Sequence, residues 1–124
     1  MNTQNHIQSI SEKKISKVID NRINNHLQAI NNFKKINEQN IIKSVDLINS
    51  CFLSGGTVFS VGNGGSAADS QHMASELMGG LRFHDRRPIK SIALTTDSSF
   101  ITAWSNDTSY DEIFSRQLDA LAEK

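Results

Sequence analysis

Residues 61–76 read VGNGGSAADSQHMASE, and this stretch decides the fold of the 124-residue chain. It follows a β-branched run, residues 57–61, that predicts a strand, and its three glycines predict a tight turn that opens into a helix. Glycine lets the backbone come close to a ligand, and the first N–H groups of a helix have no partner within it. Such a helix start favours anions, so we expect a phosphate or a polyhydroxylated phosphoester at this turn.

Two other interpretations of the turn stay open. The glycines could form only a tight strand-to-helix turn, with the serine that follows them as an ordinary helix cap. Gly62, Gly64 and Ala67 also fit G-x-G-x-x-G/A, the dinucleotide-binding fingerprint. That fingerprint needs an acidic residue at the end of the next strand, roughly 20 residues on. Asp85 has about this separation but lies in a basic, loop-like segment, and Asp97 follows a strand-like run but lies too far along.

Three charged or titratable side chains fall on one side of the predicted helix. At about 100° per residue, Asp69, His72 and Glu76 lie within one narrow sector beside the glycine turn. The other side carries apolar residues that we expect to face a sheet: Ala67, Met73, Ala74, Leu77 and Met78. His72 and Glu76 stand at i and i+4, where two side chains can hold one ion or share one proton. Such a pair is usually a solvated helix face, but beside a ligand loop we expect it to overlook the ligand pocket.

Composition narrows the class of protein. Lys plus Arg and Asp plus Glu number 13 each, so the net charge is zero and nothing indicates a polyanionic partner. Cys51 is the only cysteine, which excludes an intrachain disulfide and is typical of a reducing compartment. No apolar run approaches the ~20 residues needed to cross a membrane, and the first residues lack a signal-peptide pattern. We therefore expect a cytoplasmic protein with neither a nucleic-acid nor a membrane partner.

Two amphipathic helices are predicted before the turn. Apolar residues recur at three- and four-residue steps from Ile15 to Ile36, and again from Ile41 to Phe52. The Ser-Gly-Gly at 54–56 predicts the end of the second helix. We predict a helical hairpin over 1–54, which packs on the chain's own sheet or between subunits, and an α/β part over 55–124.

The segment after the glycine-turn helix predicts a second strand and two more helices. Residues 91–95 are short and apolar enough for a buried parallel strand, and Thr96–Ser99 predicts a helix cap. The helix would run through Trp104. The loop after it would contain Asn106 and Asp107, and the last helix would begin at Asp111. This order predicts a parallel α/β sheet with right-handed crossovers, in which ligands bind beyond the carboxyl ends of the strands.

Five motifs in this order resemble the SIS (sugar isomerase) domain family, and within it the phosphoheptose isomerases. The motifs are GNGGSAAD at 62–69, QHMASEL at 71–77, IALTTD at 92–97, ND at 106–107 and YDEIFSRQ at 110–117. The resemblance implies a flavodoxin-like, parallel-sheet αβα sandwich in a homotetramer. It also implies aldose–ketose isomerisation of sedoheptulose 7-phosphate to D-glycero-D-manno-heptose 7-phosphate through an enediol, for lipopolysaccharide precursors.

The resemblance assigns roles to residues of this chain. His72 and Glu76 would be half of a metal shell, with zinc as the Lewis acid, and Glu76 would be the catalytic base. Asp69 orients groups near the substrate or only caps the first helical turn. The implied contacts to the sugar phosphate are those of Asn63, Gly64, Gly65, Glu76, Asn106 and Asp107.

The chain also departs from the family pattern. Gly79 and Gly80 stand where the family commonly has an arginine, which Arg82 or Arg86 would have to replace. The chain ends at Lys124, before the family's phosphate-binding loop and its remaining glutamine and histidine metal ligands. We expect this chain to be a fragment of a longer isomerase, with little activity alone. Two alternatives stay open: a degenerate, inactive stub, and a chain that is completed by a second chain. The alternative function is a non-catalytic SIS protein that binds phosphosugars and acts through a protein partner, as the replication-initiator-associating relatives do.

Overall fold

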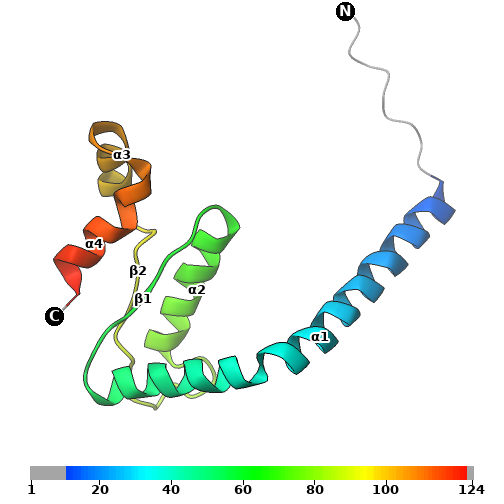
Figure 1. Ribbon diagram of the computed structural model, residues 1–124, viewed down its shortest axis with the longest axis horizontal. Coiled ribbons are helices and arrows are strands. Elements are labelled where there is room, and N and C mark those ends of the chain that lie inside the picture. Colours follow the sequence, from blue (N-terminus) through cyan, green and yellow to red (C-terminus); the bar gives the residue numbers. More distant parts are fainter. Residues whose placement is uncertain (1–10, 123–124) are drawn as a thin grey trace, which may run out of the picture. The chain divides into compact units, whose positions relative to one another are not determined.

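The computed structural model describes residues 11–122. Residues 1–10 of the predicted N-terminal part and residues 123–124 of the predicted α/β part lie outside the described residues. The elements are α1 (Glu12–Leu53), β1 (Val58–Ser60), α2 (Gly65–Gly79), β2 (Ser91–Ala93), α3 (Ser98–Asp107), a 3₁₀ helix η1 (Tyr110–Glu112) and α4 (Ile113–Leu121) (Figure 1). The chain divides into two compact units, one ending at Ser44 and one beginning at Val45.

One helix, α1, stands where the sequence predicts a hairpin of two. The residues between the two predicted helices, NEQN at 37–40, include neither glycine nor proline, and the helix continues through them to Leu53. Asparagine lowers helix propensity by a few tenths of a kcal/mol but does not end a helix. The predicted hairpin is therefore wrong, and the predicted domain boundary after residue 54 stays a prediction.

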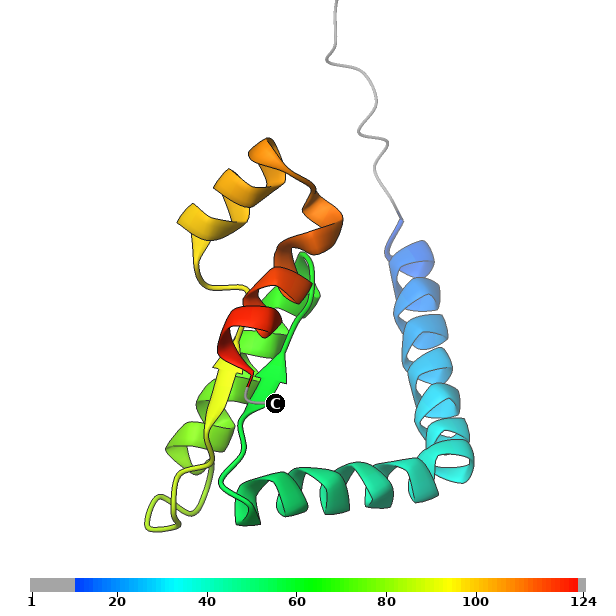
Figure 2. The ribbon, with the colours of Figure 1, turned by 60° about the vertical axis from the view of Figure 1, so that its left-hand side comes forward.

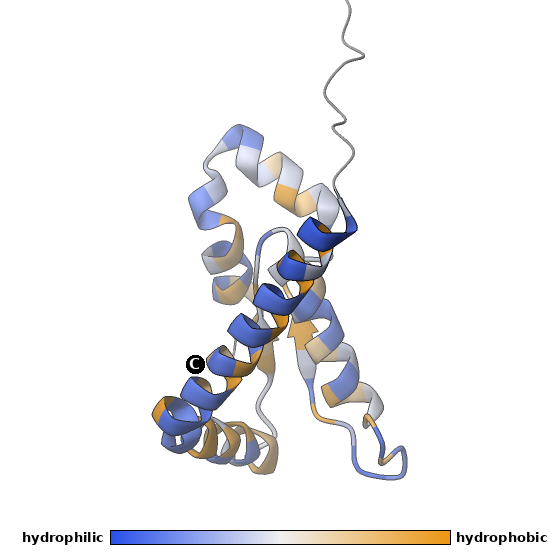
Figure 3. Cartoon of the chain, turned by 90° about the vertical axis from the view of Figure 1, so that its right-hand side faces the viewer, coloured by the Kyte–Doolittle hydropathy of each residue, from blue (hydrophilic) through white to orange (hydrophobic). Residues whose placement is uncertain are grey.

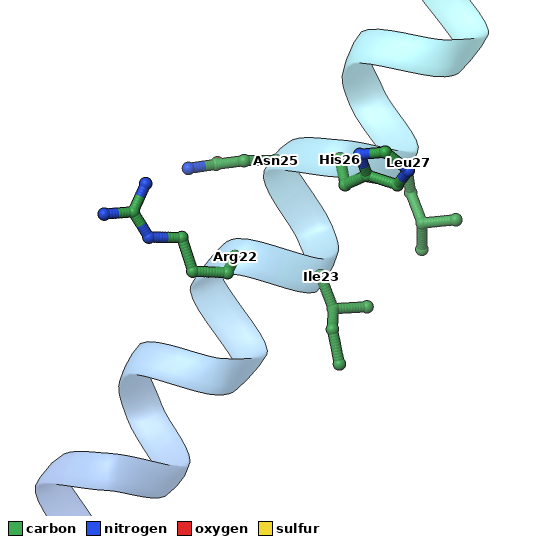
Figure 4. Close-up of a pocket in the computed structure, with 5 residues that line it drawn as sticks. All are labelled: Arg22, Ile23, Asn25, His26 and Leu27. Atoms are coloured by element: carbon green, nitrogen blue, oxygen red, sulfur yellow. The ribbon is translucent and has the colours of Figure 1, made fainter. Parts of the chain in front are cut away.

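The unit that ends at Ser44 is an amphipathic helix. Figure 3 shows apolar positions recurring among hydrophilic ones along α1, and Figure 4 shows Ile23 and Leu27 on one side of it with Arg22 and Asn25 on the other. The hollow in Figure 4 is walled by this one helix, so it is no enclosed site. The apolar side chains from Ile15 to Ile36 are exposed within the unit. None of the helices in residues 11–122 is long and apolar enough to cross a membrane.

The unit that begins at Val45 is built on a two-stranded parallel sheet. Val58 of β1 pairs with Ser91 of β2, and Ser60 pairs with Ala93. This confirms the predicted parallel α/β architecture, with α2 as the crossover. Figures 1 and 2 show the two strands between α2 and α4. The buried side chains are mostly small, which lets the helix approach the strands closely: Ser60, Ser70, Ala74, Ser91, Ala93, Leu94 and Ile113.

The face of α2 that meets the sheet is centred on Ser70 and Ala74, both buried. The Ser60 Oγ donates to the Ser70 carbonyl oxygen at 2.9 Å, so a polar contact joins helix and strand inside the core. Met73 and Met78 are exposed, and each lines an open hollow beside one strand, Met73 with Ser60 of β1 and Met78 with Ile92 of β2. The buried centre of this face is formed by small residues, and the methionines lie at its margins.

The segment after β2 confirms one predicted cap and corrects two boundaries. The Asp97 carboxylate accepts from the Phe100 N–H at 2.9 Å at the start of α3, as the cap prediction requires. Asn106 and Asp107 are the last two residues of α3, so their predicted place in a loop is wrong. The Ser109 Oγ accepts from the Asp111 N–H at the start of η1. Because η1 comes first, α4 begins at Ile113, two residues later than predicted.

Candidate functional site

The turn between β1 and α2 requires glycine at two positions. A Cβ atom on Gly62 would overlap the Ser66 carbonyl oxygen. Gly64 has φ +56°, a backbone conformation that residues other than glycine rarely adopt. Gly64 is also the N-cap residue of α2, which begins at Gly65, and no side chain caps the helix there. The interpretation of Ser66 as the helix cap is therefore wrong. The Ser66 N–H instead bonds the Asn63 carbonyl oxygen at 3.0 Å, which closes the turn.

A small hollow of about 110 Å³ opens beside this turn. Residues from three places in the sequence line it: Gly62, Asn63, Gly64, Ala67, Thr95, Ile101, Tyr110, Ile113 and Phe114. The first group follows β1 and the others follow β2, so the hollow lies beyond the carboxyl ends of both strands. This is the edge at which parallel α/β sheets bind ligands.

A hydrogen bond joins two residues that line the hollow and lie 47 positions apart in the sequence. The Tyr110 hydroxyl donates to Asn63 Oδ1 at 2.8 Å and so links η1 to the glycine turn. Sequence reasoning gave Tyr110 no role, although it is the only tyrosine of the chain and lies in the YDEIFSRQ motif. No local pattern could have joined it to Asn63, because the contact depends on how α3 returns the chain to the strand ends.

His72 and Glu76 meet on the outer side of α2. His72 Nε2 lies 3.2 Å from Glu76 Oε1, one helical turn away, and the two side chains are 75% and 38% exposed. The predicted contact between the pair is confirmed. Neither residue lines the 110 Å³ hollow. The structure therefore joins the pair but does not bring it to Asn63, and their shared role at a ligand stays a prediction.

The donor chemistry of the pair fits part of a zinc shell. Two ligands about 2.1 Å from a tetrahedral zinc ion lie roughly 3.4 Å apart, close to the observed 3.2 Å separation. An imidazole nitrogen and a carboxylate oxygen are both common zinc ligands. Within residues 11–122, however, no three His, Cys, Asp or Glu side chains gather closely enough to hold a metal ion. The described chain supplies two donors of the usual four.

The other predicted site residues are separate from this pair. Asp69 is exposed and lines a different hollow of about 360 Å³ together with Ser66 and Met73. Asn106 Nδ2 donates to Asp107 Oδ1 at 2.8 Å at the end of α3, and neither residue lines the smaller hollow. Of the predicted substrate contacts, only Asn63 and Gly64 line it. The others stay predictions.

Arg86 has a structural partner that accounts for its position. Its Nη2 atom donates to the carbonyl oxygens of Glu76 at 2.8 Å and Leu77 at 2.7 Å, in the last turns of α2. A cation at this end of a helix also interacts favourably with the helix dipole. Arg82 is exposed. Arg86 therefore holds the helix that carries Glu76, and its guanidinium is engaged by backbone.

Comparison with known proteins matches this fold and turn to one family. The SIS domain model matches residues 23–124. The chain therefore belongs to the SIS domain family.

Individual relatives are phosphoheptose isomerases. The chain is 55% identical over 84 residues to the phosphoheptose isomerase of Syntrophotalea carbinolica. The matched segment covers 67% of this chain and 42% of the relative. It is 51% identical over 87 residues to a probable phosphoheptose isomerase of Thermoplasma acidophilum, covering 70% and 47%. The chain thus spans less than half the length of these two relatives.

Solved structures of the same class of enzyme share the fold. A phosphoheptose isomerase from Francisella tularensis matches with a TM-score of 0.82 and 30% identity, over 87% of this chain and 56% of that one. The phosphoheptose isomerase from Neisseria gonorrhoeae matches with a TM-score of 0.78 and 33% identity, over 86% and 54%.

Proposed function

We propose that this chain supplies the glycine turn and the His72–Glu76 pair of a phosphoheptose isomerase. The reaction would interconvert sedoheptulose 7-phosphate and D-glycero-D-manno-heptose 7-phosphate. The observation that carries the proposal is the solvent-accessible imidazole–carboxylate pair on the helix that begins at the glycine turn. The relatives' names support the enzyme and do not favour a non-catalytic phosphosugar-binding protein.

The proposed chemistry moves one proton between adjacent carbons of the sugar. A base removes the proton next to the carbonyl group, and the resulting enediol is reprotonated at the neighbouring carbon. Glu76 is the proposed base because its carboxylate is accessible and borders the imidazole of His72. Asn63, Gly64 and Gly65 would contact the sugar phosphate at the start of α2, where unpaired N–H groups favour anionic oxygens. Asn106 and Asp107 would complete these contacts.

Zinc is the proposed metal, held by His72 Nε2 and Glu76 Oε1 with further donors from outside the described residues. When bound, it would supply a Lewis acid for the oxygen on which charge develops. What this chain contributes by itself is the spacing of the two donors, which one turn of α2 determines.

The proposed setting is a cytoplasmic homotetramer that makes heptose precursors of lipopolysaccharide. The exposed apolar side of α1 supports subunit packing, because apolar side chains at helical spacing are stabilised when another surface covers them. The proposed partner is the sugar-phosphate substrate, with no nucleic acid and no membrane, in keeping with a net charge of zero.

A chimera tests the activity. Residues 55–124 of this chain replace the matching segment of the Francisella tularensis isomerase, whose fold they share. Conversion of sedoheptulose 7-phosphate is then followed with and without added zinc, and circular dichroism verifies that the chimera folds. We expect turnover that falls when zinc is removed. A folded chimera that fails to convert this substrate, beside an active parent enzyme, would contradict the proposed function.

A further inference from the structure

The hydrogen bond between Tyr110 and Asn63 sets the direction of the Asn63 amide. The amide group of asparagine is planar, with an acceptor oxygen on one side and an NH₂ donor on the other. Because the Tyr110 hydroxyl occupies Oδ1 at 2.8 Å, Nδ2 must point the opposite way. Nδ2 has no acceptor among residues 11–122, and Asn63 is exposed at the edge of the 110 Å³ hollow. Both of its N–H groups are therefore available to a ligand.

Tyr110 is itself held in place by the fold. Ile113, directly after η1, is 2% exposed, and its N–H bonds the Tyr110 carbonyl oxygen. On the other side of η1, the Ser109 N–H bonds the Trp104 carbonyl oxygen at 3.1 Å and ties the segment to α3. The hydroxyl thus comes from an element anchored at both ends, whereas Asn63 lies in a turn of glycines.

The chemistry of the hollow makes the direction of this amide important. The phosphate oxygens of a sugar phosphate accept hydrogen bonds from an amide NH₂ group but are repelled by an amide oxygen, because both oxygens are acceptors. If the Asn63 amide rotated by half a turn, its oxygen would face such a ligand. A group that prevents this rotation in the free protein reduces the entropy that the side chain loses on binding.

We propose that Tyr110 is a positioning residue, which orients the Asn63 amide so that its NH₂ group faces an oxygen of the bound sugar phosphate. This inference rests on the proposed function, and it adds a residue to the site that acts through Asn63.

The test is a double-mutant cycle on the full chain. Sedoheptulose 7-phosphate is titrated by calorimetry into the native chain, Tyr110→Phe, Asn63→Ala and the double variant. A neutral hydrogen bond contributes modestly, so we expect Tyr110→Phe to weaken binding about three- to tenfold. In the Asn63→Ala background the same change should have no further effect, because there is no amide left to orient. Fluorescence of Trp104, the only tryptophan, verifies that each variant folds.

Two further measurements separate positioning from a merely structural bond. Asn63→Asp keeps an acceptor for Tyr110 but replaces the NH₂ group with a second carboxylate oxygen. We expect this variant to lose sugar-phosphate binding at least tenfold with little change in melting temperature; intact binding would contradict a contact between the Asn63 NH₂ group and the ligand. The NMR order parameter of the Asn63 side-chain ¹⁵N should also fall in Tyr110→Phe without ligand.

The possible results separate a failure of the role of Tyr110 from a failure of the proposed function. If the native chain does not bind sedoheptulose 7-phosphate, the proposed function fails and the role of Tyr110 fails with it. If the native chain binds and Tyr110→Phe binds equally well, only the role of Tyr110 is overturned. The same holds if the Tyr110→Phe loss is undiminished in the Asn63→Ala background.

Discussion

Arg86 holds the backbone of Glu76: its Nη2 atom donates to the Glu76 carbonyl oxygen at 2.8 Å and to that of Leu77 at 2.7 Å. The loop after α2 thereby fixes the helical turn that carries the proposed base. The side chain of Glu76 remains free to meet His72 on the outer side of the helix.

Replacing Arg86 by methionine should destabilise the chain by about 1–2 kcal/mol, because two carbonyl oxygens at a helix end lose a charged donor. Urea unfolding followed by Trp104 fluorescence measures the change. Arg82→Met is the matched control, since Arg82 is exposed in the same loop, and it should stay within about 0.5 kcal/mol of the native chain. Equal midpoints for the two variants would contradict the role given to Arg86.

Glu76→Gln should lower turnover in the chimera by about 10²- to 10⁴-fold, the usual contribution of a general base. The amide keeps the size of the side chain, so circular dichroism should be unchanged. Glu112→Gln, at an exposed glutamate of η1, is the control and should keep the activity of the chimera. Full turnover in Glu76→Gln would remove Glu76 from the mechanism.

Zinc binding should depend on the pair on α2. Calorimetric titration of the chain with zinc chloride should show an affinity about tenfold or more lower in His72→Ala and in Glu76→Ala, since each variant removes one of two donors. His84→Ala is the control, because His84 Nδ1 lies 3.4 Å from the Gly79 carbonyl oxygen and faces no carboxylate in the described contacts. Zinc affinity that depends on His84 rather than on His72 would place the metal elsewhere.

The turn before α2 and the last residue of α2 should respond oppositely to alanine. Gly62→Ala should cost about 2–3 kcal/mol, because the new Cβ overlaps backbone atoms of Ser66 and the turn must open. Gly79→Ala has open space around it and an unstrained backbone, so it should be neutral or stabilise by up to about 1 kcal/mol. Urea unfolding measures both. A Gly62→Ala chain as stable as the native one would show that the turn does not need a glycine there.

Short-range patterns in the sequence predicted most of the second unit. Both strands, the helix after the glycine turn and the Asp97 cap follow from residues within a few positions of one another, and the structure confirms them. The contact between His72 and Glu76 could be predicted for the same reason, because one helical turn sets the distance between them.

The wrong predictions concern the boundaries of helices. The apolar pattern around residues 37–40 weakens without a glycine or proline, and a weak pattern alone does not end a helix. Asn106 and Asp107 favour loops by composition, yet the turn that ends α3 begins after them. Met73 and Met78 lie beside the strands but stay exposed, because the buried centre of the face is formed by Ser70 and Ala74.

The sequence by itself determined the glycine turn, the helix that follows it and the pairing of an imidazole with a carboxylate on that helix. These depend on backbone sterics and helical periodicity, which act over a few residues. Only the tertiary structure decided that Tyr110 reaches Asn63, that Arg86 holds the backbone of Glu76 and that His72 does not line the hollow. The contact of Tyr110 depends on where a later segment returns to the ends of the strands, beside the buried Leu94 and Ile113, and not on any local pattern. The contact of Arg86 depends on how the loop between α2 and β2 folds back on the end of α2.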